Sequence, residues 1–198
     1  MRMIVVLTAM LAVAASSLRA EIYVIDAAHS SVGFRIKHLV GKVPGRFTNF
    51  TGTIAFTPGK PESWKVDATI DPASINTDNE KRDSHLKTPD FFDVAKYPAI
   101  SFKSTQVTGI KGETAKLHGD LTMHGVTKPV VLDLMLGGTT KDPWGNTRAG
   151  FSATGTLNRK DFAISFNRTL DAGGLLLGED VAISLDIEAV LKPQDAAK

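Results

Sequence analysis

Four consecutive residues, Arg82-Asp83-Ser84-His85, contain the serine, histidine and aspartate of a hydrolase triad. A triad works only when hydroxyl, imidazole and carboxylate are joined in one chain of hydrogen bonds. Neighbouring residues of a helix point in different directions, and the sequence has no G-x-S-x-G turn that would expose a serine nucleophile. The segment therefore predicts no catalytic site. We expect Arg82 and Asp83 to tie a helix to a β-barrel, which the rest of the sequence predicts, through charge-assisted hydrogen bonds, with His85 and Leu86 packed at the rim of that barrel.

Histidines are the main candidates for metal binding, because the chain has five of them and no cysteine. The lack of cysteine excludes thiol catalysis, disulfides and zinc–cysteine sites. His118 and His124 would lie about 20 Å apart along one predicted strand, too far to share an ion. The sequence shows no H-x-H, H-E-x-x-H or carboxylate–histidine pairing and predicts no metal site. His38 and His85 are candidates for hydrogen bonds to a ligand head group, with a solvated imidazole as the alternative.

Alternation of apolar and polar residues dominates the rest of the sequence. It occurs in eight segments, at residues 31–37, 50–56, 63–71, 100–105, 116–123, 130–136, 151–157 and 181–189. A period of two residues predicts antiparallel strands with one apolar face. Closure into a barrel would remove exposed edges, and a two-sheet sandwich is the alternative that the pattern leaves open. A barrel of eight strands is either filled by its own side chains or holds one slender ligand.

One segment predicts a helix instead of a strand. Thr77 and Glu80 form a capping box, with Thr77 as the N-cap and Glu80 at the third helical position. The predicted helix is short and polar, and it ends near Lys87, because Thr88-Pro89 cannot continue it.

Glycines predict a turn and several close contacts. Gly125 supplies the positive φ that a tight hairpin turn needs between the strands that flank it. Gly52, Gly119 and Gly155 lie inside strands, where glycine marks strong bending or close approach of a neighbour.

The first 20 residues have the features of a secretory signal peptide. Arg2 gives a basic start, residues 4–15 are an apolar run, and Ala20 is the small residue before the expected cleavage. The run is too short to span a membrane, so we expect residues 21–198 to form one periplasmic domain without a transmembrane segment. Of the 23 basic and 21 acidic residues, only Arg2 and Arg19 belong to the signal peptide, so the exported domain is formally neutral. This balance predicts no binding to nucleic acid.

Five stretches in a fixed order resemble one known family. They are Tyr23–Ser30, Gly45–Phe56, Ser74–Pro98, Leu117–Val130 and Arg159–Phe162. Together they resemble the YceI-like family of exported, polyisoprenoid-binding, lipocalin-like proteins. The resemblance implies an all-β fold, an extended eight-stranded antiparallel lipocalin-like barrel with one short helix. It also implies an apolar cavity that takes a long isoprenoid or similar lipid tail.

The resemblance implies periplasmic binding, sequestration or transport of a long isoprenoid-tailed lipid, such as a quinone or a polyprenyl lipid. It implies no enzymatic activity, and no cofactor apart from such a lipid. Strand parity selects most of the residues that we expect to contact the lipid, and apolar character adds Phe91 and Phe92 after the helix. The full set is Phe34, Ile36, Phe50, Ile54, Trp64, Val66, Ile70, Phe91, Phe92, Phe102, Leu121, Leu134, Phe151 and Leu185. The alternatives are a secreted hydrolase with an unrecognised site and a ligand-free structural or stress protein whose barrel is filled. The sequence leaves open whether the chain forms a homodimer.

Overall fold

Antiparallel strands account for most of the protein. The computed structural model describes residues 20–170 and 173–193, so residues 1–19 of the predicted signal peptide lie outside it. The described residues form one sheet of eleven strands. The strands are β1 (Glu21–Ile25), β2 (Ser31–His38), β3 (Gly41–Phe47), β4 (Phe50–Phe56), β5 (Lys65–Ile70), β6 (Ile75–Asn76), β7 (Ile100–Lys111), β8 (Thr114–Met123), β9 (Val126–Lys141), β10 (Thr147–Asn158) and β11 (Leu177–Leu191).

Pairing of β1 with both β4 and β11 closes a barrel in the order β1-β4-β5-β7-β8-β9-β10-β11. This confirms the predicted antiparallel barrel of eight strands and excludes the two-sheet sandwich. One of the eight strands of the ring differs from the prediction. β1 is part of the ring, whereas the sequence pattern predicted β2 in its place. β11 is long enough to pair with β1 at Ala189–Leu191 and with β2 at Leu177–Asp186.

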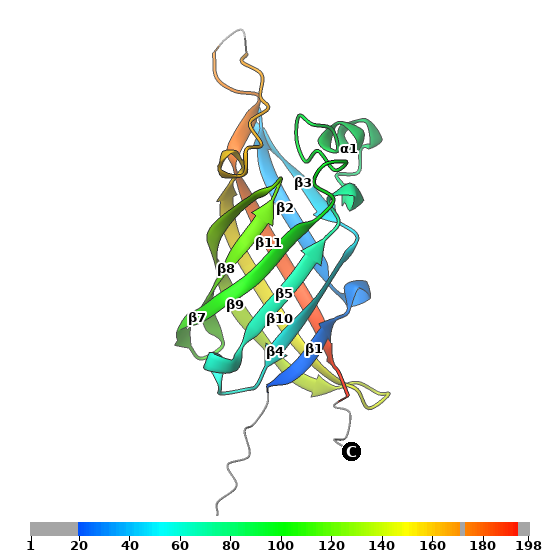
Figure 1. The fold of residues 1–198 in the computed structure, drawn as a ribbon, viewed down its shortest axis with the longest axis vertical. Helices are drawn as coiled ribbons and strands as arrows, with labels where there is room; N and C mark the ends of the chain where they lie inside the picture. The colour runs from blue at the N-terminus through cyan, green and yellow to red at the C-terminus, as the bar shows by residue number, and fades with distance from the viewer. Residues whose placement is uncertain (1–19, 171–172, 194–198) are drawn as a thin grey trace, which may run out of the picture.

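The sheet branches where β11 changes partner. β2, β3 and β6 continue the sheet from β11 toward one end of the barrel, called here the upper end (Figure 1). The helix α1 (Glu80–Leu86) and the irregular segment 87–99 lie at this end, as do the short helix η4 (Arg159–Phe162) and the loop that follows it. The opposite, lower end carries β1 and the hairpin between β9 and β10 (Figure 1). The other short helices are η1 (Ala27–His29), η2 (Pro61–Ser63) and η3 (Pro72–Ser74).

The predicted helix is present, but its predicted cap is wrong. The N-cap of α1 is Asn79, whose side chain accepts a hydrogen bond from the backbone N–H of Arg82 at 3.0 Å. Asp78 has a positive φ of 58°, which turns the chain after Thr77 and leaves Thr77 outside the cap position. Lys87 is the C-cap, as expected. Within the described part of the chain, the helices are all too short or too polar to cross a bilayer.

The glycine predictions are confirmed at the β8–β9 turn and inside the barrel. His124 and Gly125 have φ values of 52° and 75°, and two central residues with positive φ define a type I′ hairpin turn. A Cβ atom on Gly119 would lie 2.3 Å from Cζ of Phe102, and one on Gly155 would lie 2.6 Å from Cδ2 of Leu132. The missing side chains therefore make room for large apolar neighbours that point into the barrel.

Candidate functional site

The closed ring of strands surrounds an apolar cavity of about 190 Å³, called here the lower chamber. Among the described residues that line it, all are apolar or glycine except Thr51, whose side chain is exposed and has the outward parity of β4. Because side chains alternate along each strand, the apolar face of every ring strand is directed into this space. Eleven of the residues predicted to contact lipid line the lower chamber: Phe34, Phe50, Ile54, Trp64, Val66, Ile70, Phe102, Leu121, Leu134, Phe151 and Leu185.

Aromatic residues pack together at the lower end of this chamber. The ring of Phe56 lies 5.0 Å from that of Trp64 and 5.2 Å from that of Phe151, measured between centroids. Trp64 donates its indole N–H to the backbone oxygen of Thr57 at 2.8 Å, which satisfies the polar group of this largely apolar side chain. Tyr23 joins the cluster and is 1% exposed. Its pKa is raised to about 12, chiefly by burial and secondly by the hydrogen bond that its hydroxyl donates to Glu21. This aromatic cluster forms the floor of the lower chamber.

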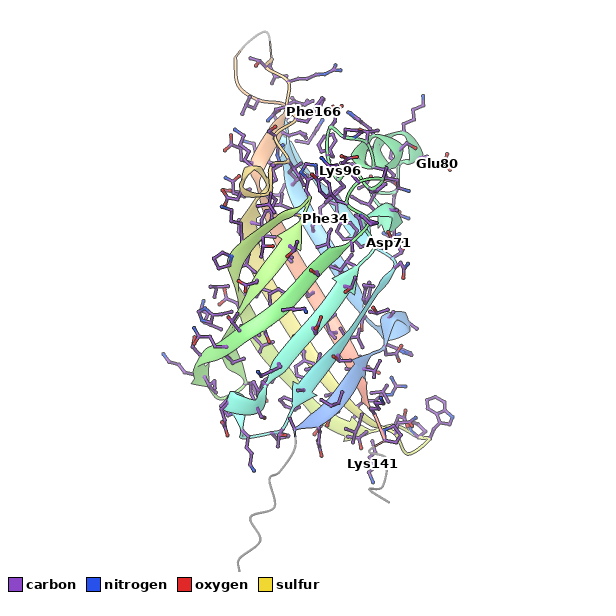
Figure 2. The ribbon with its side chains drawn as sticks, in the orientation of Figure 1. Phe34, Asp71, Glu80, Lys96, Lys141 and Phe166 are labelled. Carbon is purple, nitrogen blue, oxygen red and sulfur yellow. The ribbon has the colours of Figure 1, made fainter. Side chains whose placement is uncertain are left out.

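A second cavity of about 440 Å³, called here the upper chamber, lies beneath α1 and the loop after η4. Ile36, Phe91 and Phe92, the other residues predicted to contact lipid, line it. Figure 2 shows Phe166, from the loop after η4, at the upper end of the barrel and Phe34 below it. Phe34 lines both chambers, and the two cavities also share Phe47, Met123, Leu157 and Ile183. The chambers are therefore adjacent along the barrel, with these side chains between them, and together they are called here the slot.

The residues that resembled a hydrolase triad hold α1 in place. Arg82 donates from Nε to Oγ1 of Thr77 and from Nη2 to its backbone oxygen, both at 2.7 Å. Asp83 accepts from the backbone N–H of Thr77 at 2.9 Å. These bonds tie α1 to the residue that follows β6, which makes the attachment more local than the predicted link to the barrel. Ser84 is exposed, and no hydrogen bond joins it to His85 within the described residues.

His85 belongs to a group of aromatic rings at the mouth of the upper chamber. Its ring lies 5.1 Å from the ring of Phe91 and 5.1 Å from that of Phe166, and these two phenylalanines are 5.0 Å apart. Phe91 belongs to the segment after α1, whereas Phe166 belongs to the loop after η4. The three rings, called here the mouth cluster, therefore join two separate segments across the top of the slot. His85 Nε2 also lies 2.7 Å from a carboxylate oxygen of Asp90.

Arg159 is the main polar feature of the slot that sequence reasoning did not find. It lies at the start of η4, is 4% exposed and lines the upper chamber. Its Nε donates to the backbone oxygen of Gly178 at 2.9 Å, and its Nη1 donates to that of Ile164 at 2.8 Å. Its Nη2 has no protein partner. Burial lowers the pKa of the guanidinium, because the charged form loses hydration.

The structure corrects the statement that no carboxylate–histidine pairing exists. His29 Nδ1 lies 2.8 Å from Asp26, in addition to the pair formed by His85, and Glu188 approaches the first pair closely enough for a three-ligand cluster. Both pairings join residues separated by short turns, and their spacings match none of the sequence motifs of metal sites. Arg148 donates to both Asp26 and Glu188, so a guanidinium already neutralises these carboxylates. This hydrogen bond, more than that of His29, lowers the pKa of Asp26 to about 2. We therefore interpret the cluster as a structural ion network that joins β11 to neighbouring turns.

Some residues that line the two chambers were not predicted from the sequence, although strand parity indicated several of them. Leu117, Leu132 and Ile183 line the lower chamber and share the strand parity of the residues that were predicted. Phe166 and Leu176 line the upper chamber from a segment without alternation, where parity gives no information.

Known proteins similar to this chain extend over most of its length. A family model described as a YceI-like domain matches residues 23–189. A UPF0312 protein of Pseudomonas savastanoi pv. phaseolicola is 46% identical over 145 residues, which are 72% of this chain and 76% of the relative. The crystal structure of a Campylobacter jejuni YCEI protein is 38% identical, with a TM-score of 0.68 and coverage of 85% of this chain and 96% of its own. A polyisoprenoid binding domain from Saccharophagus degradans, 17% identical, has the same fold, with a TM-score of 0.63 and coverage of 87% and 99%.

Proposed function

The chain belongs to the YceI-like family, and we propose that it binds a long isoprenoid-tailed lipid in the slot formed by its two chambers. The apolar wall of the lower chamber carries the proposal, because the described residues that line it are all apolar or glycine except Thr51, whose side chain is exposed. Related proteins support the choice of ligand, since one structure with the same fold is that of a polyisoprenoid binding domain.

The position of the polar groups gives the ligand a direction. The lower chamber is apolar down to its aromatic floor, whereas histidine and arginine side chains occur around the upper chamber. We propose that the tail lies in the lower chamber and the head group in the upper one. Each buried CH₂ group of the tail contributes about 0.8 kcal/mol before ordering costs. An isoprenoid tail has fewer rotatable bonds than a saturated chain of equal length, so it loses less entropy in a narrow slot.

The size of the cavities favours binding over a filled structural barrel. An empty apolar cavity destabilises a protein by about 24 cal/mol per Å³. At this rate the lower chamber of about 190 Å³ would by itself cost about 4 to 5 kcal/mol if left empty. A ligand tail removes this cost, because it supplies the contacts that the facing side chains lack.

We also propose that residues 1–20 are a signal peptide and that residues 21–198 act in the periplasm as one domain. The protein would sequester or transport a quinone or polyprenyl lipid without altering it chemically. The apolar run at residues 4–15 supports the export step. The intact mass of protein from the cell-envelope fraction tests it: a mass that begins at Glu21 supports export, and recovery of only the full chain in the inner membrane contradicts it.

Native mass spectrometry tests the binding proposal. Protein purified from the envelope without added lipid should carry an extra mass, and organic extraction should release an isoprenoid of that mass. Protein freed of lipid should take up farnesol, a short isoprenoid alcohol, at one molecule per chain. Protein that carries no lipid and takes up no farnesol would refute the proposal.

A further inference from the structure

Three exposed apolar side chains, called here the apolar tip, lie on two neighbouring loops at the upper end of the barrel. Val40 is fully exposed, Leu39 is 42% exposed and Leu175 is 46% exposed. Leu39 and Val40 form the turn between β2 and β3, and Leu175 belongs to the loop after η4 (Figure 1). The backbone N–H of Leu39 donates to the oxygen of Leu176 at 3.0 Å, which joins the two loops. Single apolar residues are normal on a surface, whereas a group of them marks a contact surface.

The turn itself gives no reason for these side chains. Leu39 has a φ of 52°, in the left-handed region, where a bulky side chain is strained and glycine is not. A two-residue hairpin turn with positive φ at its first position normally has glycine there. Folding alone would therefore favour glycine over Leu39, and contact with water would favour a polar residue over Val40. Both side chains fit a surface that a partner covers.

Cationic side chains flank the apolar tip on both strands. Residues 31–47, which contain β2, the turn and β3, have no acidic residue and four cations: Arg35, Lys37, Lys42 and Arg46. Lys37 and Lys42 are exposed and lie directly opposite each other, although like charges in this arrangement destabilise a sheet. Arg46 pairs with Asp78, whereas the other three cations form no ion pair within the described residues. The apolar tip therefore lies beside positive charge that the protein does not neutralise.

We propose that the apolar tip inserts into the surface of an anionic lipid bilayer, with Lys37 and Lys42 at the level of the lipid phosphates. Apolar side chains flanked by lysine or arginine are typical of segments that lie in the membrane interface. The negative surface potential of such a bilayer attracts each cation that comes near it. A bilayer also offers negative charge on every side of the tip, which matches two lysines on opposite strands.

Two other occupants fit the apolar tip less well. A protein partner of ordinary affinity covers about 800 Å² on each side, and three aliphatic side chains on two loops supply only a small part of that area. A second copy of this chain, related by a twofold axis through the tip, would place Lys37 and Lys42 against like charges. The charge and the small size of the tip therefore favour the bilayer.

Insertion of the apolar tip would bring the mouth of the slot to the bilayer. Along β2, Ile36 and His38 line the upper chamber, whereas Lys37 between them is exposed. Leu176, next to Leu175 of the tip, also lines this chamber. The same two loops therefore carry the tip on the outside and part of the chamber wall on the inside. A lipid would then pass between bilayer and slot without crossing water. The membrane contact goes beyond the proposed function and stands without it, whereas this transfer of lipid rests on that function.

Sedimentation with vesicles tests the membrane contact. The mature protein should bind vesicles of phosphatidylglycerol and phosphatidylcholine about 10-fold or more tightly than vesicles of phosphatidylcholine alone. Added salt should weaken the binding to the anionic vesicles, because it screens the lysines. Lys37→Gln and Lys42→Gln should each lower the affinity about 5-fold. Val40→Ser should lower it about 10-fold, because the apolar side chain that the bilayer buries is lost.

Leu39→Gly separates the loss of contact from the loss of structure. Glycine adopts the positive φ of this position without strain, so the melting temperature should stay at or above that of the wild type. Vesicle binding should nevertheless weaken about 10-fold, because the leucine side chain is lost. Val131→Ser and Lys65→Gln are the matched controls, since Val131 is 50% exposed on β9 and Lys65 is exposed at the start of β5. Both controls should bind vesicles as the wild type does.

Each contrary result has a distinct meaning. Wild-type protein that binds neither kind of vesicle, or both equally well, would overturn the membrane contact. Unchanged binding in Leu39→Gly, Val40→Ser and the lysine variants would overturn its assignment to the apolar tip. A dimer in analytical ultracentrifugation that Val40→Ser dissociates would make a second copy of the chain the occupant and overturn the bilayer. All variants should keep the farnesol affinity of the wild type. Protein that binds farnesol but no vesicles refutes the inference alone, and protein that binds vesicles but no farnesol refutes the proposed function alone.

Discussion

The substitution Leu121→Trp distinguishes a barrel that holds lipid from a barrel filled by its own side chains. Leu121 is 9% exposed, lines the lower chamber and packs beside Ile100 and Phe102. A tryptophan ring here would occupy the space of two to three CH₂ groups of a tail. At about 0.8 kcal/mol for each CH₂, the loss is about 1.6 to 2.4 kcal/mol, which weakens binding about 15- to 60-fold. Titration of lipid-free protein with farnesol, read by native mass spectrometry or tryptophan fluorescence, measures the change.

The melting temperature of the lipid-free variant gives the second half of this test. In a filled core the larger ring would be forced between packed neighbours and would cost about 1 to 3 kcal/mol. In an empty slot the ring enters free space, so the melting temperature should stay near that of the wild type. Val131→Trp is the matched control, because Val131 lies on the neighbouring strand β9 and is 50% exposed. Unchanged farnesol affinity in Leu121→Trp, with or without a lower melting temperature, would refute the placement of the tail beside Leu121.

Three further results are expected from the structure. Phe166→Ala removes two aromatic contacts of the mouth cluster, so stopped-flow measurements should show uptake and release of farnesol accelerated on the order of 10-fold; unchanged rates would contradict this. Gly119→Ala would press a methyl group against Phe102 and should lower the free energy of unfolding by about 1 to 3 kcal/mol in a denaturant titration. A variant as stable as the wild type would show that Phe102 moves aside without cost. Arg148 holds the pKa of Asp26 near 2, so this ion pair stabilises the fold by about 1 kcal/mol after solvent screening; the stabilisation is complete above about pH 4 and is lost as the pH falls through about 2. Arg148→Gln should flatten the profile of melting temperature against pH over that range. An unchanged profile would contradict the assignment of the pKa shift to Arg148.

Alternation predicted the barrel well because most of its strands have one face in the apolar interior and one in water. β1 escaped prediction because Ile22 and Val24 are apolar although they point outward, at 39% and 43% exposure, so the segment shows no alternation. The position of the helix was predicted from local residues, but its cap was not. The cap depends on the positive φ of Asp78, and that turn accompanies contacts of Thr77 with two later residues of α1.

The two chambers differ in how far the sequence could describe them. Strand parity places a residue such as Leu134 on the inner face because a barrel has only two faces, and the structure puts it in the wall of the lower chamber. The upper chamber has strand residues in its wall, such as Ile36 of β2, which parity also predicted. Its cover comes from α1 and irregular segments, where no period of two relates the side chains. Arg159 became visible only in the fold, because its guanidinium is bound by the backbone oxygens of Ile164, five residues along the chain, and of Gly178, nineteen residues along the chain.

The length of β11 explains why the two ends of the slot are closed in different ways. At Ala189–Leu191 it pairs with β1, and backbone hydrogen bonds complete the ring around the aromatic floor. Over Leu177–Asp186 it pairs with β2 instead, and the sheet departs from the ring. The wall above that point is completed by α1 and by the loop after η4, which meet through side chains of the mouth cluster. Side-chain contacts can separate without breaking a sheet, whereas opening the ring would require loss of a strand pairing. We therefore expect a lipid to pass tail first through the upper end, which leaves its head group beside Arg159.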